Sequence, residues 1–547
     1  MTIIAYMDDI KVHTGNQKAA SAITEMLRTA AQELGLSLNV AKCAVYGRNL
    51  KPEEVDDMDL PYVDTNYKHL GLFQIERDQN VNIEVLEEKI LRQAKTIMES
   101  RLSSFQKRAI FNSTTIPAAI YVTGNVLLQE SVATTLLTCE SLDKEIGKIA
   151  TQAQIKTRST SNQRLYMSTS VGGLGYKSIA LETAIHYVRR YWYLQNNEEL
   201  VVTREYYECL NRGKCRTPIS DYQHVLEKYK VTNIEATDEA DRRKAAQTII
   251  KAIYEQNDRE RKETWAKSMF YPKLIVKYYN KISFPAIQCR QLDSSKLSLL
   301  NAAAEEQWFA MRGISKQNGG ICRRCRSHEE TAYHVVTACK HNYAERHDFV
   351  AYWLIRTIIE ATKAPVVVKN QLKFGRANLN CEYTTEGRRI NITCGIPVLT
   401  PQRIHHKKPD VLVKVEKEDK TTIYVFEVVI PHLQNYETQE AVKITRYAKN
   451  SVTHVDHLNY STVGRDANLV DELRQMNRCP VKFGVMAIGV FGEVLSTDTQ
   501  KKLWSLLAEM GVTETQIRSL LEKAAYSALT GTARILMKHV GKQEEEQ

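Results

Sequence analysis

The sequence predicts a multidomain protein that is α/β toward both ends and mainly helical between them. Its 547 residues exceed what one hydrophobic core usually organises, and this length favours three or four domains. Its 43% hydrophobic and 25% charged residues are ordinary for chains that fold. Strand-like runs occur near the N-terminus and again after residue 410, whereas residues 85–200 have helical periodicity. We therefore expect separate α/β and helical domains.

Charge and cysteine content narrow the class of protein. The chain has 75 Lys and Arg against 64 Asp and Glu, with a pI near 8.9, which mildly favours an anionic partner such as nucleic acid. Its eleven cysteines form no paired framework and no secretory signal opens the chain, so we expect a reducing compartment. The longest apolar run, near Val485 to Phe491, is too short to span a membrane, and we expect no membrane partner.

The N-terminal stretch IIAYMDDIKVH predicts a hairpin of two strands with Asp8 and Asp9 at its tip. Such a carboxylate pair suits Mg²⁺, which selects oxygen ligands, although aspartates are also common in turns because of their side-chain hydrogen bonds. Neighbouring strand residues point to opposite faces, so both carboxylates cannot face the same metals. The context has to decide between the two interpretations.

Three elements follow this hairpin. NQKAASAITEMLRTAAQELG predicts an amphipathic helix that ends at Gly35. LSLNVAKCAVYG predicts a strand that carries Lys42, and the segment YKHLGL begins with Tyr67 and Lys68. From residue 85 to about residue 200 the chain is expected to be helical, with the glycine cluster around Gly173 forming a turn.

The stretch CRRCRSHEETAYHVVTAC has the spacing of a zinc site. Two thiols lie on a tight turn, and an imidazole and a third thiol follow little more than one helical turn apart, so they can converge on one tetrahedral Zn²⁺. The predicted ligands are Cys322, Cys325, His334 and Cys339. Buried free cysteines are the alternative, but the stretch is too charged to be core material. His328 and His341 are imidazoles that can substitute as ligands.

The next stretch, YAERHDFVAYWL, places Arg346, His347 and Asp348 as a polar cluster on an otherwise apolar helix. Beside a basic zinc module, this cluster suits contact with a nucleic-acid backbone. We therefore predict that Arg346 and His347 bind nucleic acid.

KKPDVLVKVEKEDKTTIYVFEVVIPH predicts strands over residues 411–415 and 422–429, joined by a charged turn. This hairpin would bring Asp410 and Glu427 together to hold Mg²⁺ or Mn²⁺, unless it is an ordinary surface hairpin. Lys407 and Lys408, with His405 and His406 before them, would then meet phosphate.

This carboxylate arrangement resembles that of the PD-(D/E)xK nucleases, and the resemblance implies a third group, a lysine, that stabilises the charge developing as water attacks the phosphate. The usual position, two residues after the glutamate, is Val429 here. The following stretch QEAVKITRYAKN places Glu440, Lys443 and Tyr447 on one helical face. Lys443 is therefore the predicted cation, and Lys449 is the second choice.

The order of YMDD, GLxxNxxK, YKHLG, RLSSFQKRAIFNSTTIPAAIY, the zinc stretch, RHD and the PD hairpin resembles one family. This family is the site-specific non-LTR retrotransposon polyproteins, which join a reverse transcriptase to a zinc knuckle and a restriction-enzyme-like endonuclease. The family itself has the nuclease lysine on the following helix. The resemblance implies these domains: a truncated reverse transcriptase palm (1–80), thumb and post-thumb helices (81–200), a helical connector (201–315), a zinc knuckle with its following helix (316–360), a PD-(D/E)xK-type nuclease (365–500) and C-terminal helices (501–547).

In this family, the residue matching Asp8 is a catalytic metal ligand, that matching Asp9 supports it, and the YKHLG segment grips the primer end. Such palms also need an upstream aspartate, which this sequence lacks before Met1, so we expect an incomplete polymerase site and read Met1 as an internal start. The residues expected to touch nucleic acid are Lys42, Tyr67, Lys68, Arg346, His347, Lys407 and Lys408.

The resemblance implies a nuclear RNA-directed DNA polymerase and endonuclease, synthesised in the cytoplasm. Its cofactors would be Zn²⁺ and Mg²⁺ or Mn²⁺, and its partners a DNA target, the element RNA and a second copy of the protein. It would nick DNA and prime reverse transcription from the freed 3′-OH. The alternative is a catalytically inactive nucleic-acid-binding relic or a host-retained copy.

Overall fold

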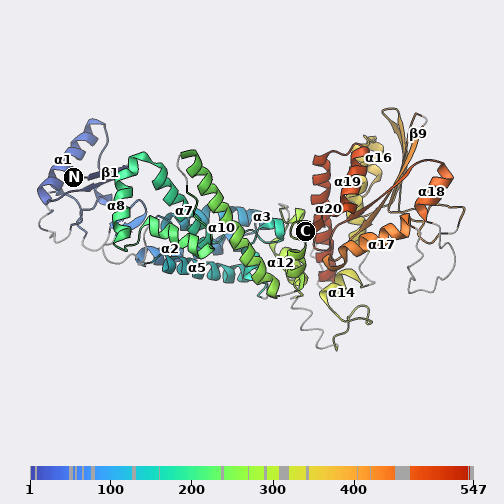
Figure 1. The fold of residues 1–547 in the computed structure, drawn as a ribbon, viewed down its shortest axis with the longest axis horizontal. Coiled ribbons are helices and arrows are strands. Elements are labelled where there is room, and N and C mark those ends of the chain that lie inside the picture. Colours follow the sequence, from blue (N-terminus) through green and yellow to red (C-terminus); the bar gives the residue numbers. More distant parts are fainter. Residues whose placement is uncertain are drawn as a thin grey trace. The chain divides into compact units, whose positions relative to one another are not determined.

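The computed structural model describes residues 2–6, 9–47, 53, 55, 58–63, 67–74, 80–125, 131–158, 160–235, 239–268, 270–288, 292–306, 319–339, 344–402, 404–418, 420–449, 468–539 and 541. The chain forms two compact units, both mixed in helix and strand (Figure 1). The first unit comprises residues 1–94, 114–145 and 178–253, and the second comprises residues 95–113, 146–177 and 254–547. The predicted zinc stretch, nuclease and C-terminal helices all belong to the second unit.

The N-terminal hairpin is confirmed. Strands β1 (Thr2–Tyr6) and β2 (Asp9–His13) pair antiparallel, with Tyr6 opposite Asp9. Helix α1 (Gln17–Glu33) follows, and Asn16 caps it by accepting a hydrogen bond from the backbone of Ala19. Gly35 has a φ of +71°, the left-handed conformation that glycine adopts after a helix end.

The strand predicted around Lys42 is wrong. Lys42 is the last residue of a short 3₁₀ helix, η1 (Val40–Lys42), and the described part of LSLNVAKCAVYG pairs only through one bridge between Val45 and Tyr62. A strand needs a partner over several residues, and a single bridge does not provide one. YKHLGL instead forms a small hairpin of β3 (Tyr67–His69) and β4 (Leu72–Gln74), which turns at Gly71 with φ +80°.

The helices predicted between residues 85 and 200 are confirmed. Their bounds, with those of the helices that follow, are α2 (Asn80–Glu99), α3 (Ser104–Ile110), α4 (Ile116–Thr123), α5 (Val132–Gln152), α6 (Asn162–Tyr166), α7 (Ile179–Asn196), α8 (Val201–Arg212), α9 (Pro218–Tyr229) and α10 (Glu239–Ser268). The glycine cluster is a turn, since Gly172 and Gly175 have φ values of +81° and +71°. In the first unit, the buried carboxylate of Asp221 joins α9 to α7 by pairing with Arg190, and it also pairs with Arg216.

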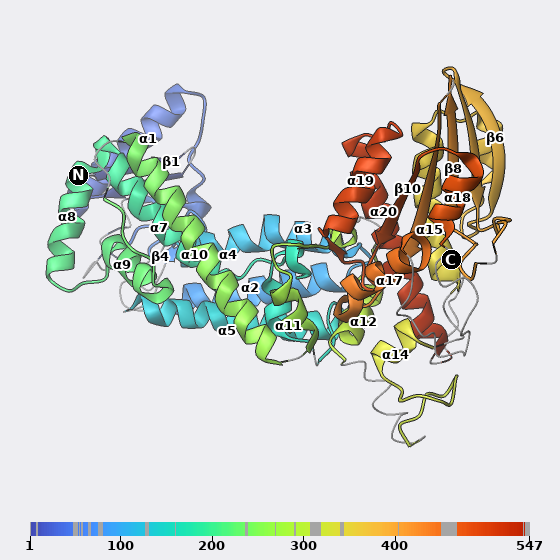
Figure 2. The same cartoon turned by 45° about the vertical axis from the view of Figure 1, so that its right-hand side comes forward.

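A five-stranded sheet organises the second unit (Figure 2). Its spatial order is β10 (Val481–Ala487), β9 (Lys420–Val429), β8 (Val411–Lys417), β7 (Arg388–Cys394) and β6 (Leu379–Thr385). β6 to β9 are antiparallel neighbours, and β10 runs parallel to β9. Every residue of β9 from Ile423 onward is buried, because strands lie on both sides and helices pack against the sheet.

Helices make up most of the rest of the second unit. Their bounds are α11 (Phe270–Lys277), α12 (Ser294–Ala304), α14 (Ala332–Thr337), α15 (Ala344–Ala361), α16 (Val366–Gln371), α17 (Tyr436–Ala448), α18 (Leu469–Asn477), α19 (Asp498–Glu509) and α20 (Glu514–His539). α15 packs along α20 and also touches β9, whereas α17 and α19 pack on β10. Strands β5 (Ile282–Ser283) and β11 (Val494–Leu495) form a separate pair. Within the described residues, every helix falls short of the length and apolarity that a membrane crossing requires.

Candidate functional site

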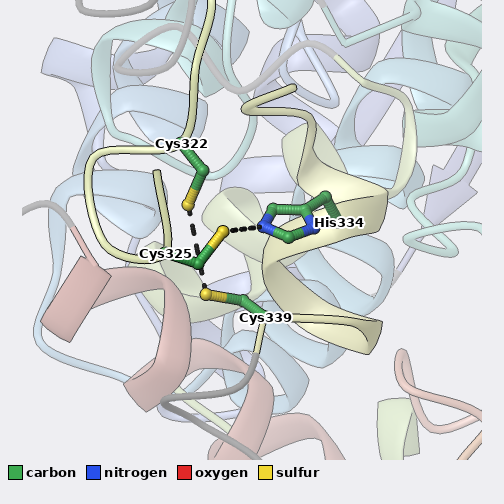
Figure 3. A group of neighbouring side chains, drawn as sticks. All are labelled: Cys322, Cys325, His334 and Cys339. Carbon is green, nitrogen blue, oxygen red and sulfur yellow. Dashed lines mark hydrogen bonds between the residues drawn. The ribbon is translucent and has the colours of Figure 1, made fainter. Parts of the chain in front are cut away.

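The predicted zinc ligands converge (Figure 3). A short loop brings Cys322 and Cys325 together, because the Arg326 N–H donates to the Cys322 carbonyl and the Cys322 N–H donates to the His328 carbonyl. Thr331 caps α14 by accepting from the His334 N–H at 3.0 Å, which orients the helix that carries the imidazole. Two backbone hydrogen bonds in the loop and one helix cap therefore hold the four side chains close together.

The geometry fits one tetrahedral metal ion. The four ligand atoms of Cys322, Cys325, His334 and Cys339 all lie within 4.8 Å of one another. The sulfurs of Cys322 and Cys339 are 4.0 Å apart, and the Cys325 sulfur is 3.2 Å from His334 Nε2. Tetrahedral coordination at metal–sulfur distances of about 2.3 Å places two sulfurs about 3.8 Å apart. Hydrogen bonds from Ser327 lower the pKa of the Cys325 thiol to about 5, which favours the thiolate that metals bind.

Of the two histidines that could substitute as ligands, His328 lies within the described part of the chain. The His328 ring stacks on His334 with centroids 5.1 Å apart, and its Nδ1 lies 3.1 Å from the Ser327 hydroxyl. It therefore packs beside the ligand group. His341 lies outside the described residues.

A buried acid and histidine lie next to the ligand group. Glu330 accepts hydrogen bonds from Arg323 Nε at 2.7 Å and lies 2.5 Å from His539 Nε2, at the end of α20. Burial alone would raise the pKa of Glu330, but the hydrogen bonds from Arg323 and His539 lower it to about 2. The Glu330–His539 contact fastens the loop that carries the two cysteines to α20. Cys322, Glu330 and His539 form a second, overlapping group of potential ligands.

The hairpin of β8 and β9 brings Asp410 and Glu427 together as predicted. Val411 pairs with Phe426, so Asp410 lies opposite Glu427. The Asp410 N–H donates to Glu427 Oε1 at 3.0 Å, and the Val428 N–H donates to Asp410 Oδ2 at 2.7 Å. Each carboxylate is thus held by the backbone of the strand that carries the other.

Two cations complete this cluster. Lys443 Nζ, from α17, lies 2.6 Å from Glu427 Oε2 and 3.8 Å from Asp410 Oδ2. His347 Nε2, from α15, lies 3.2 Å from Asp410 Oδ2, while its Nδ1 lies 3.3 Å from Asp348. Lys443 therefore occupies the place that sequence reasoning assigned to it, and His347 is an additional member.

The surroundings shift the pKa values of the two carboxyl groups in opposite directions. Burial and the neighbouring charge of Asp410 raise the pKa of Glu427, against the opposing effect of Lys443, to about 8. Burial also acts to raise the pKa of Asp410, but the hydrogen bond and charge of His347 and the charge of Lys443 lower it to about 2. Asp410 is therefore the carboxylate that stays ionised.

The polar neighbours of the cluster are mostly in place. Lys407 and Lys408 are exposed immediately before Asp410, and the Tyr447 hydroxyl donates to the Lys408 carbonyl at 3.0 Å. Lys449 is exposed just beyond the end of α17.

Glu440, in contrast, turns away from the cluster. It accepts hydrogen bonds from the Thr497 hydroxyl at 3.0 Å and the Gln500 amide at 2.9 Å. Of the three residues predicted to share this helical face, Lys443 and Tyr447 contact the carboxylate cluster or the chain just before it, whereas Glu440 packs against α19.

The predicted nucleic-acid role of Arg346 is not compatible with its burial. Its side chain is 1% exposed, and its guanidinium donates to the Val336 carbonyl at 2.8 Å and to the Thr532 hydroxyl at 2.9 Å. Arg346 therefore joins α14, α15 and α20 from the inside. The residues of the RHD motif therefore have different contacts. Arg346 packs inside the second unit, whereas the next residue, His347, contacts Asp410.

The predicted polymerase residues belong to the first unit. Asp9 opens β2 and is exposed, whereas Asp8 lies outside the described residues. Lys42 is exposed at the end of η1. Tyr67 is half-buried in β3 with Lys11 Nζ 5.1 Å from its ring centroid, and the side chain of Lys68 lies outside the described part of the chain.

No protein-family model matches the chain, and no curated protein matches its sequence, so the function has to be argued from these two clusters alone.

Proposed function

We propose that the second unit is a metal-dependent DNA-nicking nuclease of a site-specific non-LTR retrotransposon polyprotein. One observation carries the proposal: Lys443 from α17 meets Asp410 and Glu427 from the β8–β9 hairpin, with its ammonium 2.6 Å from Glu427. A lysine on the helix after the second strand is the arrangement that the retrotransposon nucleases show. The five-stranded sheet supplies a rigid base for it.

Asp410 and Glu427 would hold Mg²⁺ or Mn²⁺, because carboxylate oxygens are the donors these ions prefer. A metal bound there supplies an activated water and stabilises the leaving oxygen. Lys443 lies close enough to both carboxylates to stabilise the negative charge that develops on the phosphate. His347, 3.2 Å from Asp410 Oδ2, would help to orient this carboxylate.

Lys407 and Lys408, which are exposed before Asp410, would bind the flanking phosphates of the DNA target. The three cysteines and His334 would hold Zn²⁺, a structural role in which the metal closes the loop before α14. In the full polyprotein, Asp8 and Asp9 would serve the polymerase, and Lys42, Tyr67 and Lys68 would lie along the template and primer. The element RNA, a second copy and a nuclear location belong to the same proposal.

The test is nicking of supercoiled plasmid by the purified chain with Mg²⁺ or Mn²⁺. The wild type is expected to produce open circles, whereas Asp410→Asn and Lys443→Met should lose roughly 100-fold or more of the rate, as expected when a metal ligand or charge-stabilising donor is removed. Lys449→Met is the matched control, because Lys449 is an exposed lysine at the end of the same helix.

Two results would oppose the proposal. Equal nicking by the wild type and Asp410→Asn would show that the activity comes from elsewhere. If the wild type binds DNA but does not nick it, the chain is better explained as a catalytically inactive nucleic-acid-binding protein.

A further inference from the structure

An aromatic cluster lies where α15 meets the segment after α16. Phe374, in the segment after α16, stacks on Phe349 with centroids 4.8 Å apart and planes inclined by 28°. Tyr352 and Trp353 meet the Phe374 ring edge-on, at centroid distances of 5.1 Å and 6.0 Å. Phe374 is nevertheless 55% exposed, whereas Phe349, Tyr352 and Trp353 are half-buried beneath it.

Cations are interleaved with these rings. Arg534 and Lys523, both from α20, lie over Phe349 and Trp353 at 5.3 Å and 5.0 Å from the ring centroids. Lys373 and Arg376 flank Phe374 in the chain and are exposed. Arg534 and Lys523 already cover Phe349 and Trp353, so Phe374 is the ring that a ligand can reach. An exposed ring flanked by cations matches a ligand that has both flat rings and negative charges.

The cluster and His347 lie on different sides of α15. Phe349 follows His347 by two residues, which is about 200° around a helix, so the aromatic side chains point away from the side that reaches Asp410. Gly375 has a φ of +77°, and a Cβ on it would lie 2.6 Å from the Phe349 ring, so only glycine lets the chain pass this close.

The same segment continues toward Asp410. A Cβ on Gly395 would lie 3.3 Å from the Ala377 carbonyl and 3.9 Å from Lys408 Cε. The Gly395 N–H donates to the Asp410 carbonyl at 3.2 Å. Residues 374–378 therefore connect the aromatic cluster to the backbone at the catalytic carboxylate.

We propose that Phe374, supported by Phe349, Tyr352 and Trp353, is a stacking surface for an unpaired nucleic-acid strand that binds the second unit. Unpaired bases expose their faces to aromatic side chains, whereas bases inside a duplex are already stacked on one another. The flanking cations would pair with the phosphates of the same strand. This binding does not depend on the proposed nuclease function.

The experiment measures binding by fluorescence anisotropy, with no added divalent metal, to a labelled oligo-dT single strand and to a hairpin duplex of equal charge. Phe374→Ala is expected to weaken single-strand binding by roughly 5- to 150-fold, the effect of losing about one stacked base. Duplex binding should change by less than twofold. Phe374→Tyr, which keeps the ring, should bind the single strand as the wild type does.

Val367→Ala is the matched control, since Val367 is 70% exposed on the neighbouring α16 and has no ring. It is expected to bind like the wild type. Circular dichroism confirms that each variant is folded, which is expected because Phe374 lies largely on the surface. The proposal is overturned if Phe374→Ala leaves single-strand affinity unchanged, as an apolar protein-docking surface would, or if it weakens both nucleic acids equally.

The two proposals fail separately. Loss of single-strand affinity in Phe374→Ala together with an inactive wild type on plasmid would support the stacking surface and reject the nuclease. Active nicking together with unaffected single-strand binding would support the nuclease and reject the surface.

Discussion

Replacing Arg346 by methionine is expected to destabilise the second unit by roughly 3–6 kcal/mol, because each hydrogen bond from a charged donor contributes about 1.5–3 kcal/mol. Two such bonds are lost, to the Val336 carbonyl and the Thr532 hydroxyl, at a site that is 1% exposed. Methionine keeps much of the stem packing, which fits tightly, since a Cβ on Gly531 would lie 2.8 Å from Arg346 Cγ.

Hydrogen exchange read by mass spectrometry is the suitable assay, because it reports the free energy of local opening for peptides from α14, α15 and α20. Arg346→Met should lower amide protection in all three helices. Lys407→Met is the control, since Lys407 is exposed and was assigned the same nucleic-acid role from sequence. It should leave protection unchanged and weaken DNA binding, especially at low salt. Weaker DNA binding with unchanged protection in Arg346→Met, as expected for Lys407→Met, would show that Arg346 does not stabilise these helices.

Three further predictions concern other parts of the chain. Asp221→Asn should destabilise the first unit by about 3–5 kcal/mol in urea unfolding, because it leaves two largely buried arginine side chains without their buried counter-ion; an unchanged midpoint would contradict this role. The wild type should carry one zinc per chain by elemental analysis and Cys339→Ser substantially less, whereas Cys394→Ser, a buried cysteine of β7 outside the ligand group, should retain it; equal zinc in both variants would reject the ligand assignment. Burial raises the pKa of Glu493 to about 7, so this residue favours folding most when it is protonated, below its ordinary pKa, and that contribution is lost as the pH rises through 7. Glu493→Gln should therefore gain stability relative to the wild type between pH 4.5 and 7.5, by up to about 3 kcal/mol; a pH-independent difference would show that Glu493 does not titrate in this range.

The parts of the site that sequence reasoning found are those fixed by local geometry. Asp410 and Glu427 lie at the base of one hairpin whose short turn sets the register, and Lys443 follows on the next helix. The four metal ligands lie within one short stretch, so their spacing alone predicts convergence.

The contacts that it missed depend on packing between distant segments. His347 and Asp410 are 63 residues apart, and no local pattern shows which side of α15 faces the sheet. Arg346 looked like a surface cation because an arginine is rarely buried, and only the packing of α20 shows that it is.

Two misses had a signal or a clear physical reason. The β6–β7 hairpin was not predicted, although LNCEYTTEGRRINITC alternates apolar and polar residues around Gly387, which has φ +70°. The sequence predicts an apolar side for α1, but most of that side is not covered by other residues. Ile23 is buried, whereas Met26 and Leu34 are 70% and 76% exposed. Periodicity predicts a helix, and it does not say how much of the apolar side is covered.

The reciprocal bonds at the base of the β8–β9 hairpin make strand alignment part of the site. Asp410 Oδ2 accepts from the backbone of β9, and Glu427 Oε1 accepts from the Asp410 backbone at the start of β8. A slip of two residues would keep every side chain on its own face, yet it would separate the carboxylates by two positions. A cation that binds both carboxylates would therefore stabilise this alignment of the two strands relative to shifted alignments, and it would favour the native strand pairing during folding.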